Sequence, residues 1–420
     1  MIRCDKRKVS ADNFKRTLKI MKLAESIVGW KSEITAIRRD IHAHPELAYE
    51  EVRTADIVAR LLESWGIPTH RGMGVTGVVG TIHGKTQNGR ALGLRADMDA
   101  LPMQELNAFE HASKHPGKMH ACGHDGHTAM LLAAARYLAE HRDFDGTVYV
   151  IFQPAEEGFS GAKAMIDDGL FTTFPMQAIF GMHNWPGMDF GTFGVTTGPV
   201  MASSNTFEIR LEGKGAHGAM PHLGTDPVMA AVQLAQSFQT IISRDRDPQD
   251  PAVLSVTQIH TGSADNVIPN DAILRGTVRT FTDKNLDLIE NRMAEITEHT
   301  SRALNCTSEF TFHRKYPPTV NHAREAELCA RVLTQIVGAE KVDQSVPPSM
   351  GAEDFAFMLK EVPGCYVWIG NGQGDHRTAG HGLGPCTLHN GNYDFNDDLI
   401  PLGATYWAEL AIQWLAKAPS

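Results

Sequence analysis

Two kinds of hydrophobic pattern alternate along much of the chain. Segments 34–65 and 128–140 have apolar residues at helical spacing. Between and after them come short, strongly apolar runs that suit buried β-strands. These runs lie at 77–83, 91–95, 147–152, 178–182 and 365–369. Strands that alternate with helices in this way predict an α/β fold, in which a mostly parallel sheet is covered by helices on both faces.

The pattern changes after residue 200. From 205 to 313 the order is strand, helix, strand, strand, helix, strand. The segments are 206–211, 227–243, 253–260, 272–280, 285–304 and 309–313. Each helix has a single apolar stripe, which favours a ferredoxin-like β-α-β-β-α-β domain with both helices on one face of its sheet. Because the strand at 365 follows this block, we expect it to be inserted into a discontinuous first domain.

Length, charge and cysteine content limit the number of domains and the kinds of partner that the chain can have. At 420 residues the chain exceeds the size that a single hydrophobic core usually reaches, so two domains are expected. A formal net charge of −10 argues against a nucleic-acid partner. We expect no membrane association, since no apolar stretch is long enough for a span and no secretory signal opens the chain. Six sparse cysteines favour reduced thiols and a cytoplasmic location.

The first residues stand apart from the rest. Residues 1–22 contain eight Lys or Arg and two Asp. We interpret residues 1–26 as a disordered extension, or as a stretch upstream of a true start at Met21. An organelle-targeting peptide is the alternative, but the segment lacks the Ser-rich, acid-free composition that such peptides have.

The densest cluster of metal-ligand side chains lies at 119–127, with the sequence M-H-A-C-G-H-D-G-H. Thiolate, imidazole and carboxylate together suit a transition metal such as zinc or a near neighbour. A structural site would usually be closed with Cys and His alone, so the nearby carboxylates favour a metallohydrolase. The alternative is that Cys122 is a nucleophile activated by His124. That alternative leaves the carboxylate pair and a later histidine, His183, unexplained.

Three further groups of polar side chains each follow an apolar run. They are Asp97 and Asp99 after 91–95, Glu156 and Glu157 after 147–152, and His183 after 178–182. Open α/β sheets place their sites beyond the carboxyl ends of the strands, so these groups are expected to meet. The helix predicted at 128–140 would add the positive end of its dipole, which favours a thiolate.

Each of these residues also has a structural interpretation. Adjacent acids in a loop are usually solvated, but Glu156 and Glu157 emerge from an apolar strand. Such a pair allows one carboxylate to bind metal and the other to accept the proton of a metal-bound water. Asp97 and Asp99 could cap a turn, or orient a ligand histidine. His217 lies in a glycine-rich loop, where a lone histidine is more often solvated.

Three other enzyme motifs are either absent or lie in the wrong context. The stretch G-M-G-V-T-G (72–77) matches the dinucleotide fingerprint G-x-G-x-x-G, but a strand-like run follows it where that fingerprint needs a helix. Neither a G-x-S-x-G elbow nor an H-E-x-x-H helix occurs in the sequence.

Seven motifs occur together and in a fixed order. They are H-P-E-L (44–47), R-A-D-M-D-A-L-P (95–102), C-G-H-D-G-H (122–127), A-E-E-G (155–158), M-H-N (182–184), G-A-H-G-A-M-P-H (215–222) and G-A-E-D-F (351–355). In these the chain resembles the bacterial hippurate hydrolases and the plant indole-acetyl-amino acid hydrolases, a branch of the metal-dependent aminoacylase/carboxypeptidase superfamily. The resemblance runs from about Ile34 to near the C-terminus.

The resemblance implies an α/β/α catalytic domain at 27–200 and 314–420, and an inserted lid or dimerisation domain at 201–313. It implies that one or two divalent ions (Zn, or Mn, Co or Ni) are bound by Cys122, His124, Glu157, His183 and His389. Glu156 would be the general base, with Asp99 beside it. His217 would reach the active site of a neighbouring subunit, and Asn266 and Arg279 would contact the substrate carboxylate. A homodimer or a dimer of dimers is expected.

The function expected is hydrolysis of N-acyl amino acids to a carboxylic acid and a free amino acid. Two alternatives stay open: a dipeptidase or carboxypeptidase on the same fold, and a non-catalytic metal-binding protein. The intact Glu156 weighs against the latter. The acyl group and the metal are left undetermined, because pocket shape decides the first and metal supply contributes to the second.

Overall fold

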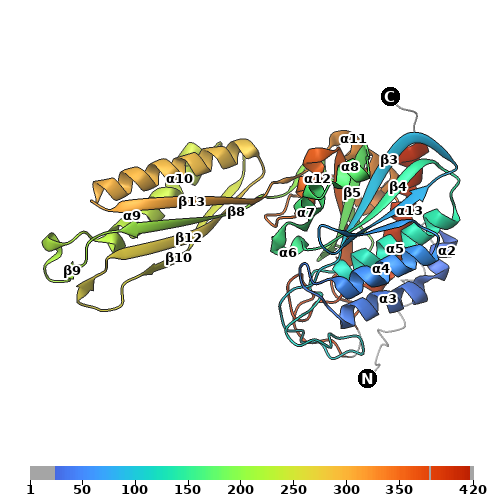
Figure 1. Cartoon of the computed structure of the whole chain (residues 1–420), viewed down its shortest axis with the longest axis horizontal. Coiled ribbons are helices and arrows are strands. Elements are labelled where there is room, and N and C mark those ends of the chain that lie inside the picture. The colour runs from blue at the N-terminus through green and yellow to red at the C-terminus, as the bar shows by residue number, and fades with distance from the viewer. Residues whose placement is uncertain (1–23, 378–379, 417–420) are drawn as a thin grey trace, which may run out of the picture. The chain divides into compact units, whose positions relative to one another are not determined.

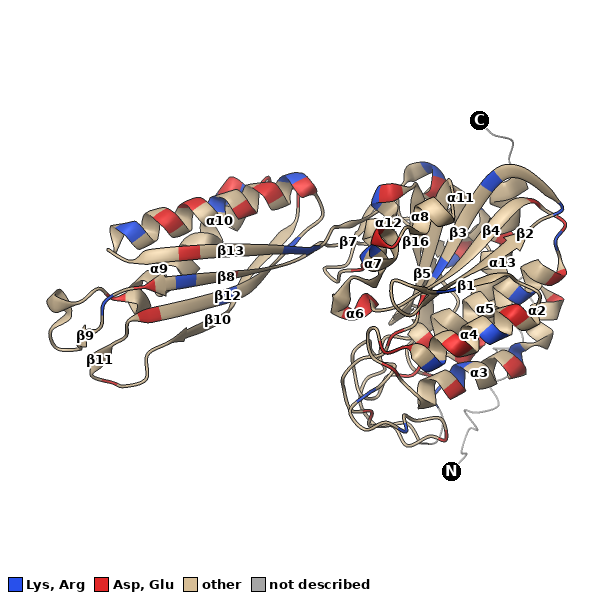
Figure 2. Ribbon diagram, viewed as in Figure 1, with Lys and Arg blue, Asp and Glu red and all other residues tan. Residues whose placement is uncertain are grey.

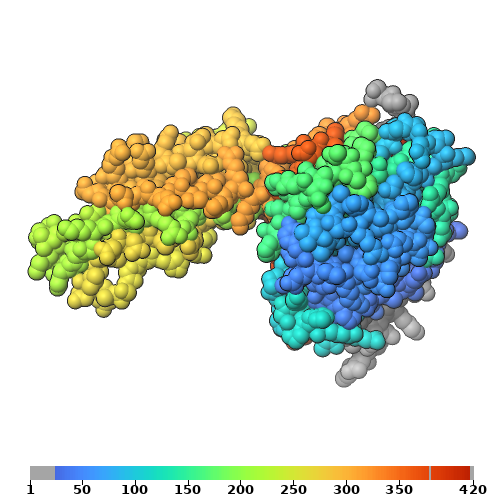
Figure 3. Space-filling model, viewed as in Figure 1, coloured from blue at the N-terminus to red at the C-terminus, as the bar shows by residue number. Residues whose placement is uncertain are grey.

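The computed structural model describes residues 24–377 and 380–416, so nearly all of the extension expected at 1–26 lies outside the described residues (Figure 1). The chain divides into two compact units. The first comprises Met1–Gly198, Val320–Pro347 and Phe357–Ser420, and the second comprises Pro199–Thr319 and Pro348–Ala356. In Figure 3 the first unit combines blue and green early segments with orange late ones, as this discontinuous division requires.

The first unit is built on an eight-stranded sheet in the order β1-β2-β4-β3-β5-β16-β6-β15. Its strands are β1 (Thr69–Met73), β2 (Gly77–His83), β3 (Thr86–Asp97), β4 (Asp145–Gln153), β5 (Ala178–Pro186), β6 (Phe193–Gly194), β15 (Val342–Asp343) and β16 (Gly364–Gly372). The central strands β4, β3, β5 and β16 are parallel, whereas β1 and β2 add antiparallel strands at one edge. The prediction of a mostly parallel α/β sheet is therefore confirmed.

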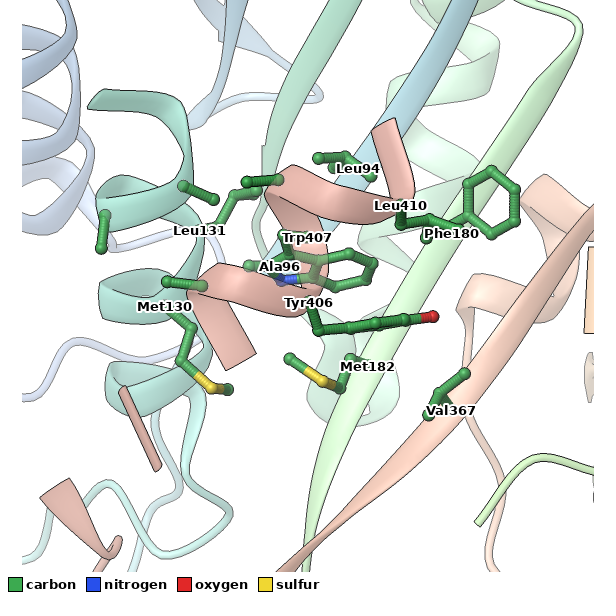
Figure 4. Close-up of a cluster of buried hydrophobic side chains, with 14 of the residues drawn as sticks. Leu94, Ala96, Met130, Leu131, Phe180, Met182, Val367, Tyr406, Trp407 and Leu410 are labelled. Carbon is green, nitrogen blue, oxygen red and sulfur yellow. The ribbon is translucent and has the colours of Figure 1, made fainter. Parts of the chain in front are cut away.

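Helices bury one face of this sheet in a large apolar core. The helices of the unit are α2 (Glu25–Gly29), α3 (Lys31–Ala43), α4 (Val52–Ser64), α5 (His124–Glu140), α6 (Glu156–Phe159), α7 (Gly161–Asp167), α8 (Leu170–Thr173), α11 (Ala323–Val337) and α13 (Ile400–Ala416), with short 3-10 turns at Ala339–Lys341 and Asp397–Leu399. Figure 4 shows Trp407 and Leu410 of α13 close to Leu94 of β3 and Phe180 of β5. Trp407 is almost fully buried, and losing an aromatic side chain of this kind costs about 3–5 kcal/mol.

Two helix boundaries differ from those that the apolar pattern predicts. The segment 34–65 forms two helices, α3 and α4, separated by the H-P-E-L turn, because Pro45 disfavours helical backbone in the residue before it. Helix α5 begins at His124 and not at 128. Gly123, with φ +95°, turns the chain into this helix, and a Cβ on Gly126 would lie 2.3 Å from the ring of Phe395. The first turn is polar, so its burial was not visible as an apolar stripe.

The second unit contains a four-stranded antiparallel sheet in the order β10-β12-β8-β13. Its main elements are β8 (Ser204–Glu212), α9 (Pro227–Thr240), β10 (Ala252–Thr261), β12 (Asp271–Thr280), α10 (Asp283–Ala303) and β13 (Thr307–Tyr316). This order confirms the predicted ferredoxin-like fold. Helix α10 presents charged residues outward (Figure 2) and buries Leu286, Ile289 and Met293. Side chains cap both helices: Asp226 accepts from the Val228 N–H, and Thr282 accepts from the Asn285 N–H.

Short elements complete the described chain. They are β7 (Gly198–Met201), β9 (Ala216–His217), a 3-10 turn at Pro221–Leu223, a π-helical turn at Ile241–Asp245, β11 (Val267–Ile268), β14 (Thr319–Asn321) and α12 (Phe355–Glu361). Among residues 24–377 and 380–416, none of the helices combines the length and the apolar composition that a bilayer crossing requires.

Candidate metal centre

The carboxyl ends of three central strands and the start of one helix carry the candidate ligands. Asp97 is the last residue of β3, and His183 lies in the second half of β5. Glu156 and Glu157 follow β4 by way of Ala155, whose left-handed φ of +53° turns the chain away from the sheet. The topology therefore gathers at one edge of the sheet the groups that follow separate strands in the sequence.

Five side chains from four segments meet here, and we call them the metal-ligand cluster: Cys122, His124, Glu157, His183 and His389. Cys122 Sγ lies 3.3 Å from His183 Nε2, and His389 Nε2 lies 3.2 Å from Glu157 Oε1. Potential ligand atoms of His124, Glu156 and Glu157 lie within 4.8 Å of one another, and so do those of Cys122, His124 and His183. His389 has a left-handed backbone conformation, and its backbone N–H donates a hydrogen bond to the Ala121 carbonyl.

The orientation of His124 fits a metal ligand. Its Nδ1 lies 2.9 Å from the Asp99 carbonyl oxygen and 3.2 Å from Asp99 Oδ1, so Nδ1 carries the proton that these oxygens accept. Its Nε2 is buried and has no hydrogen-bond partner among the described residues. A buried ring nitrogen without a partner is rare in proteins unless it binds something. The other oxygen of Asp99 accepts from the Glu157 N–H at 2.9 Å, so one carboxylate orients two members of the cluster.

A second set of contacts holds His183, and it includes residues that the motifs alone did not single out. The His183 Nδ1 proton is donated to the Asn184 carbonyl at 2.6 Å, which leaves Nε2 facing Cys122. The Asn184 N–H donates to His127 Nε2 at 3.0 Å, and His127 Nδ1 bonds Asp97 at 2.6 Å. Both ring nitrogens of His127 are therefore occupied. His127 and Asn184 lie inside the quoted motifs, but a motif does not show which members point inward.

The pKa shifts of Cys122 and His124 indicate that the site has a deficit of positive charge. Burial raises the pKa of the Cys122 thiol well above its ordinary value, and the carboxylates of Glu157 and Glu156 raise it further. Burial alone would lower the pKa of His124, but Asp97 and Asp99 outweigh it and raise the pKa to about 10. A site that favours protonated imidazole and opposes thiolate is one that a divalent cation would stabilise. The donor set and its charge thus fit a metal ion.

A second buried polar cluster adjoins the first. We call it the ion-pair network, and it comprises Arg38, His42, Glu105, Asp125, Asp394 and Asp397. Arg38 Nη1 donates to Asp125 Oδ2 at 3.0 Å, and Arg38 Nε donates to Asp397 Oδ1 at 2.7 Å. His42 contacts the same Asp125 oxygen at 2.9 Å. Asp125 follows the ligand His124 directly, so the first turn of α5 contributes to both clusters.

The second unit holds the remaining predicted residues, and it brings only two of them together. His217 pairs with Val267, the residue after Asn266, and His217 and Asn266 line a cavity of about 680 Å³. Asp271, at the start of β12, lines it too, whereas Arg279 lies eight residues farther along that strand. At about 3.3 Å per residue, Arg279 is roughly 26 Å from Asp271. Arg279 is partly buried and contacts the Ser203 carbonyl.

Comparisons with known proteins identify similar sequences and a similar fold. Residues 93–413 match the model of the peptidase family M20/M25/M40. A hippurate hydrolase of Campylobacter jejuni is 37% identical over 94% of this chain and 100% of its own length. An IAA-amino acid hydrolase ILR1-like 4 of Arabidopsis thaliana is 39% identical over 91% of this chain and 86% of its own length. The crystal structure of the Bacillus subtilis YXEP protein, a dinuclear metal-binding peptidase from the M20 family, superposes with a TM-score of 0.80 at 32% identity, covering 93% of this chain and 99% of that one.

Proposed function

The chain belongs to the peptidase family M20/M25/M40, and on that premise we propose how its first unit cleaves the amide bond of an N-acyl amino acid. The products are a carboxylic acid and a free amino acid. The observation that carries the proposal is the position of Glu156. It is a buried carboxylate beside the metal-ligand cluster, with an oxygen within 4.8 Å of the ligand atoms of His124 and Glu157.

We propose that Cys122, His124, Glu157, His183 and His389 hold one or two divalent ions, which are zinc, manganese, cobalt or nickel. Thiolate, imidazole and carboxylate ligands suit this group of metals. The chemistry that a bound ion supplies is acidification of water and polarisation of the scissile carbonyl. Asp99 keeps His124 and Glu157 in the orientation that ligation requires.

Glu156 acts as the general base in this proposal. Its carboxylate accepts the proton of the water that attacks the acyl carbon, and it later delivers that proton to the leaving nitrogen as the C–N bond breaks. The left-handed turns at Ala155 and Gly158 fix the short segment that carries Glu156. A fixed base favours proton transfer because the reacting groups need no further alignment.

The test is Glu156→Gln in the metal-loaded enzyme, with hydrolysis of N-benzoylglycine as the readout. The amide keeps the shape of the side chain but cannot accept the proton, so kcat should fall roughly 10²–10⁴-fold. Metal content and unfolding temperature should stay near those of the wild type. Glu50→Gln, which changes an exposed carboxylate paired with Lys118, is the matched control. Near-normal turnover of the Gln variant would remove Glu156 from the base role. If the wild type cleaves no N-acyl amino acid, the function itself is wrong.

We further propose that residues 201–313 act as a lid and dimerisation domain and that the enzyme is a homodimer, alone or paired into a dimer of dimers. Strands β10 and β13 are the edges of the second unit's sheet, and edge strands can pair with another chain. In this proposal His217 serves the partner's site, and Asn266 and Arg279 contact the substrate carboxylate. A cytoplasmic location remains part of the proposal; the cysteines among the described residues are all free.

Mixing two inactive variants tests the dimer. Glu156→Gln and His217→Ala homodimers should each be nearly inactive, whereas a heterodimer contains one site with both residues intact. Random exchange between two-site dimers should restore up to about a quarter of wild-type activity. Absence of recovery, with subunit exchange demonstrated by differently tagged chains, would place His217 in its own subunit's site or outside catalysis.

A further inference from the structure

An exposed aromatic ring lies on the same short segment as the proposed base. Phe159 is 63% exposed and follows Glu157 by two residues, at the end of α6. The Cα atoms of two residues so close in sequence are at most about 7 Å apart. A large, exposed apolar side chain therefore lies on the same short segment as the proposed base and a proposed metal ligand.

The backbone around Phe159 is fixed in unusual conformations. Ala155 and Ser160 have left-handed φ angles of +53° and +60°, and Gly158 between them has φ +88°. Residues with side chains persist in this region only where the surrounding structure determines their conformation, and such residues gather at functional sites. Tyr49, which contacts Phe159, is left-handed as well, with φ +64°. The backbone that carries the ring is thus set by the fold.

The turn that follows H-P-E-L holds this segment at both ends. Glu51 Oε1 accepts from the Ala155 N–H at 2.9 Å, at the start of the segment. Tyr49 donates its hydroxyl proton to the Phe159 carbonyl at 2.9 Å, at the end. The Tyr49 and Phe159 rings lie edge to face, with centroids 6.4 Å apart and planes at 78°. With 63% of its surface exposed, Phe159 has apolar surface available for another ring, and aromatic rings favour such contacts.

We propose that Phe159, backed by Tyr49, is the specificity-determining contact for the acyl group and favours acyl groups that carry an aromatic ring over small aliphatic ones. The inference rests on the proposed function, because it needs an acyl carbon beside Glu156. The substituent of that carbon is one bond away from the reacting centre, so a benzoyl ring lies within reach of Phe159. An acetyl group presents only a methyl group to the same surface.

The experiment compares kcat/KM for N-benzoylglycine and N-acetylglycine in the metal-loaded enzyme. Phe159→Ala should lower the benzoyl-to-acetyl ratio of kcat/KM about 10-fold, the size expected for a lost ring contact and its buried area. Phe159→Tyr should restore the ratio, because it keeps the ring. Tyr49→Phe, which removes only the bond to the Phe159 carbonyl, should lower the ratio by a smaller factor. Val28→Ala, an exposed apolar residue on α2, is the control and should leave the ratio unchanged.

Two results would overturn the proposal. If Phe159→Ala lowers both rates equally, the ring only stabilises the segment that carries the base. If it changes neither rate, the ring does not contact the acyl group. Failure of the proposed function has a different result, since the wild type would then hydrolyse neither substrate.

Discussion

The metal-ligand cluster and the ion-pair network are both polar, both largely buried apart from the exposed His389, and adjoin the same turn of α5, yet they balance their charges differently. In the ion-pair network, Arg38 and His42 supply positive charge to Asp125 and its neighbouring carboxylates. At the metal-ligand cluster, burial and the carboxylates of Glu157 and Glu156 raise the pKa of the Cys122 thiol, and burial lowers the pKa of His124 less than Asp97 and Asp99 raise it. Buried charge is costly unless it is paired. The ion-pair network contains its own cations, whereas a divalent ion would supply positive charge to the metal-ligand cluster.

The difference shows how successive residues can have separate roles. His124 points its free ring nitrogen into the metal-ligand cluster, and Asp125 accepts from Arg38 and His42 on the other side. The motif C-G-H-D-G-H therefore contains candidate ligands, such as His124, and residues that are held in ion pairs, such as Asp125. Charge separates the two residues: Asp125 is paired with Arg38 and His42, whereas His124 lies beside the carboxylates of Asp97 and Asp99.

The largest effect is expected in the network. Arg38→Met removes the cation but keeps an unbranched side chain, so the buried Asp125 and the partly buried Asp397 lose their shared partner. Breaking a buried ion pair in this way should lower the free energy of unfolding by about 3–5 kcal/mol. Arg38→Lys should lose less, because it keeps the charge. Urea unfolding of the metal-free proteins measures this, and equal stability of wild type and Arg38→Met would refute the contrast between the two clusters.

A smaller effect, on binding and not on folding, is expected in the metal-ligand cluster. Cys122→Ser replaces a thiolate by a much poorer ligand, so affinity for Zn²⁺ should fall on the order of 10²-fold or more. Competition with a chromogenic chelator measures the Kd. Cys386→Ser makes the same change at a buried thiol that contacts the Asp394 carbonyl, within reach of the network. Cys386→Ser should keep the wild-type affinity for Zn²⁺. An equal loss of affinity in both variants would show that Cys122 acts through packing and not as a ligand.

The smallest effect is a pH dependence of the network. Burial lowers the pKa of His42, but Asp125 outweighs it and raises the pKa to about 10, compared with about 6.5 in the unfolded chain. The stabilisation by protonated His42 is therefore complete below pH 6.5 and lost as the pH rises toward 10. His42→Gln should destabilise the protein by about 2 kcal/mol at pH 6, the contribution of a hydrogen bond to a charged group. The difference in unfolding temperature should shrink by pH 9.5, and a constant difference would contradict the charged state.

The sequence predicted the parts of the molecule that bury apolar side chains in regular patterns. The central strands and the ferredoxin-like order of the second unit were predicted because their periodicity is strong. The strand Thr69–Met73 was missed, since its mostly exposed residues lack that pattern. The start of α5 was placed too late, because His124, Asp125 and His127 are buried polar residues. Polar side chains that are buried and hydrogen-bonded do not contribute to the apolar pattern of the sequence.

The sequence predicted which candidate side chains would lie together, but not the contacts that they make. Cys122, His124 and His183 follow from ligand chemistry and strand ends, and the resemblance added His389. The hydrogen bonds of His127 with Asp97 and Asn184 could not be predicted, because they depend on the direction of the His127 side chain. The separation of Arg279 from His217 and Asn266 likewise depends on their places along the strands, which a shared sequence motif does not reveal.

The discontinuity of the first unit has a consequence for synthesis. Glu157 and His389 are about 230 residues apart, and β16 and α13 also come after the inserted unit. At roughly 5–20 residues per second, the ribosome takes about 10–45 s between the two ligands. During that time β5 lacks its neighbour β16, and Phe180 lacks the cover of α13. The nascent chain thus exposes an unpaired central strand while the second unit is completed. We expect chaperones to bind the chain mainly during this interval, because its apolar surface is then uncovered.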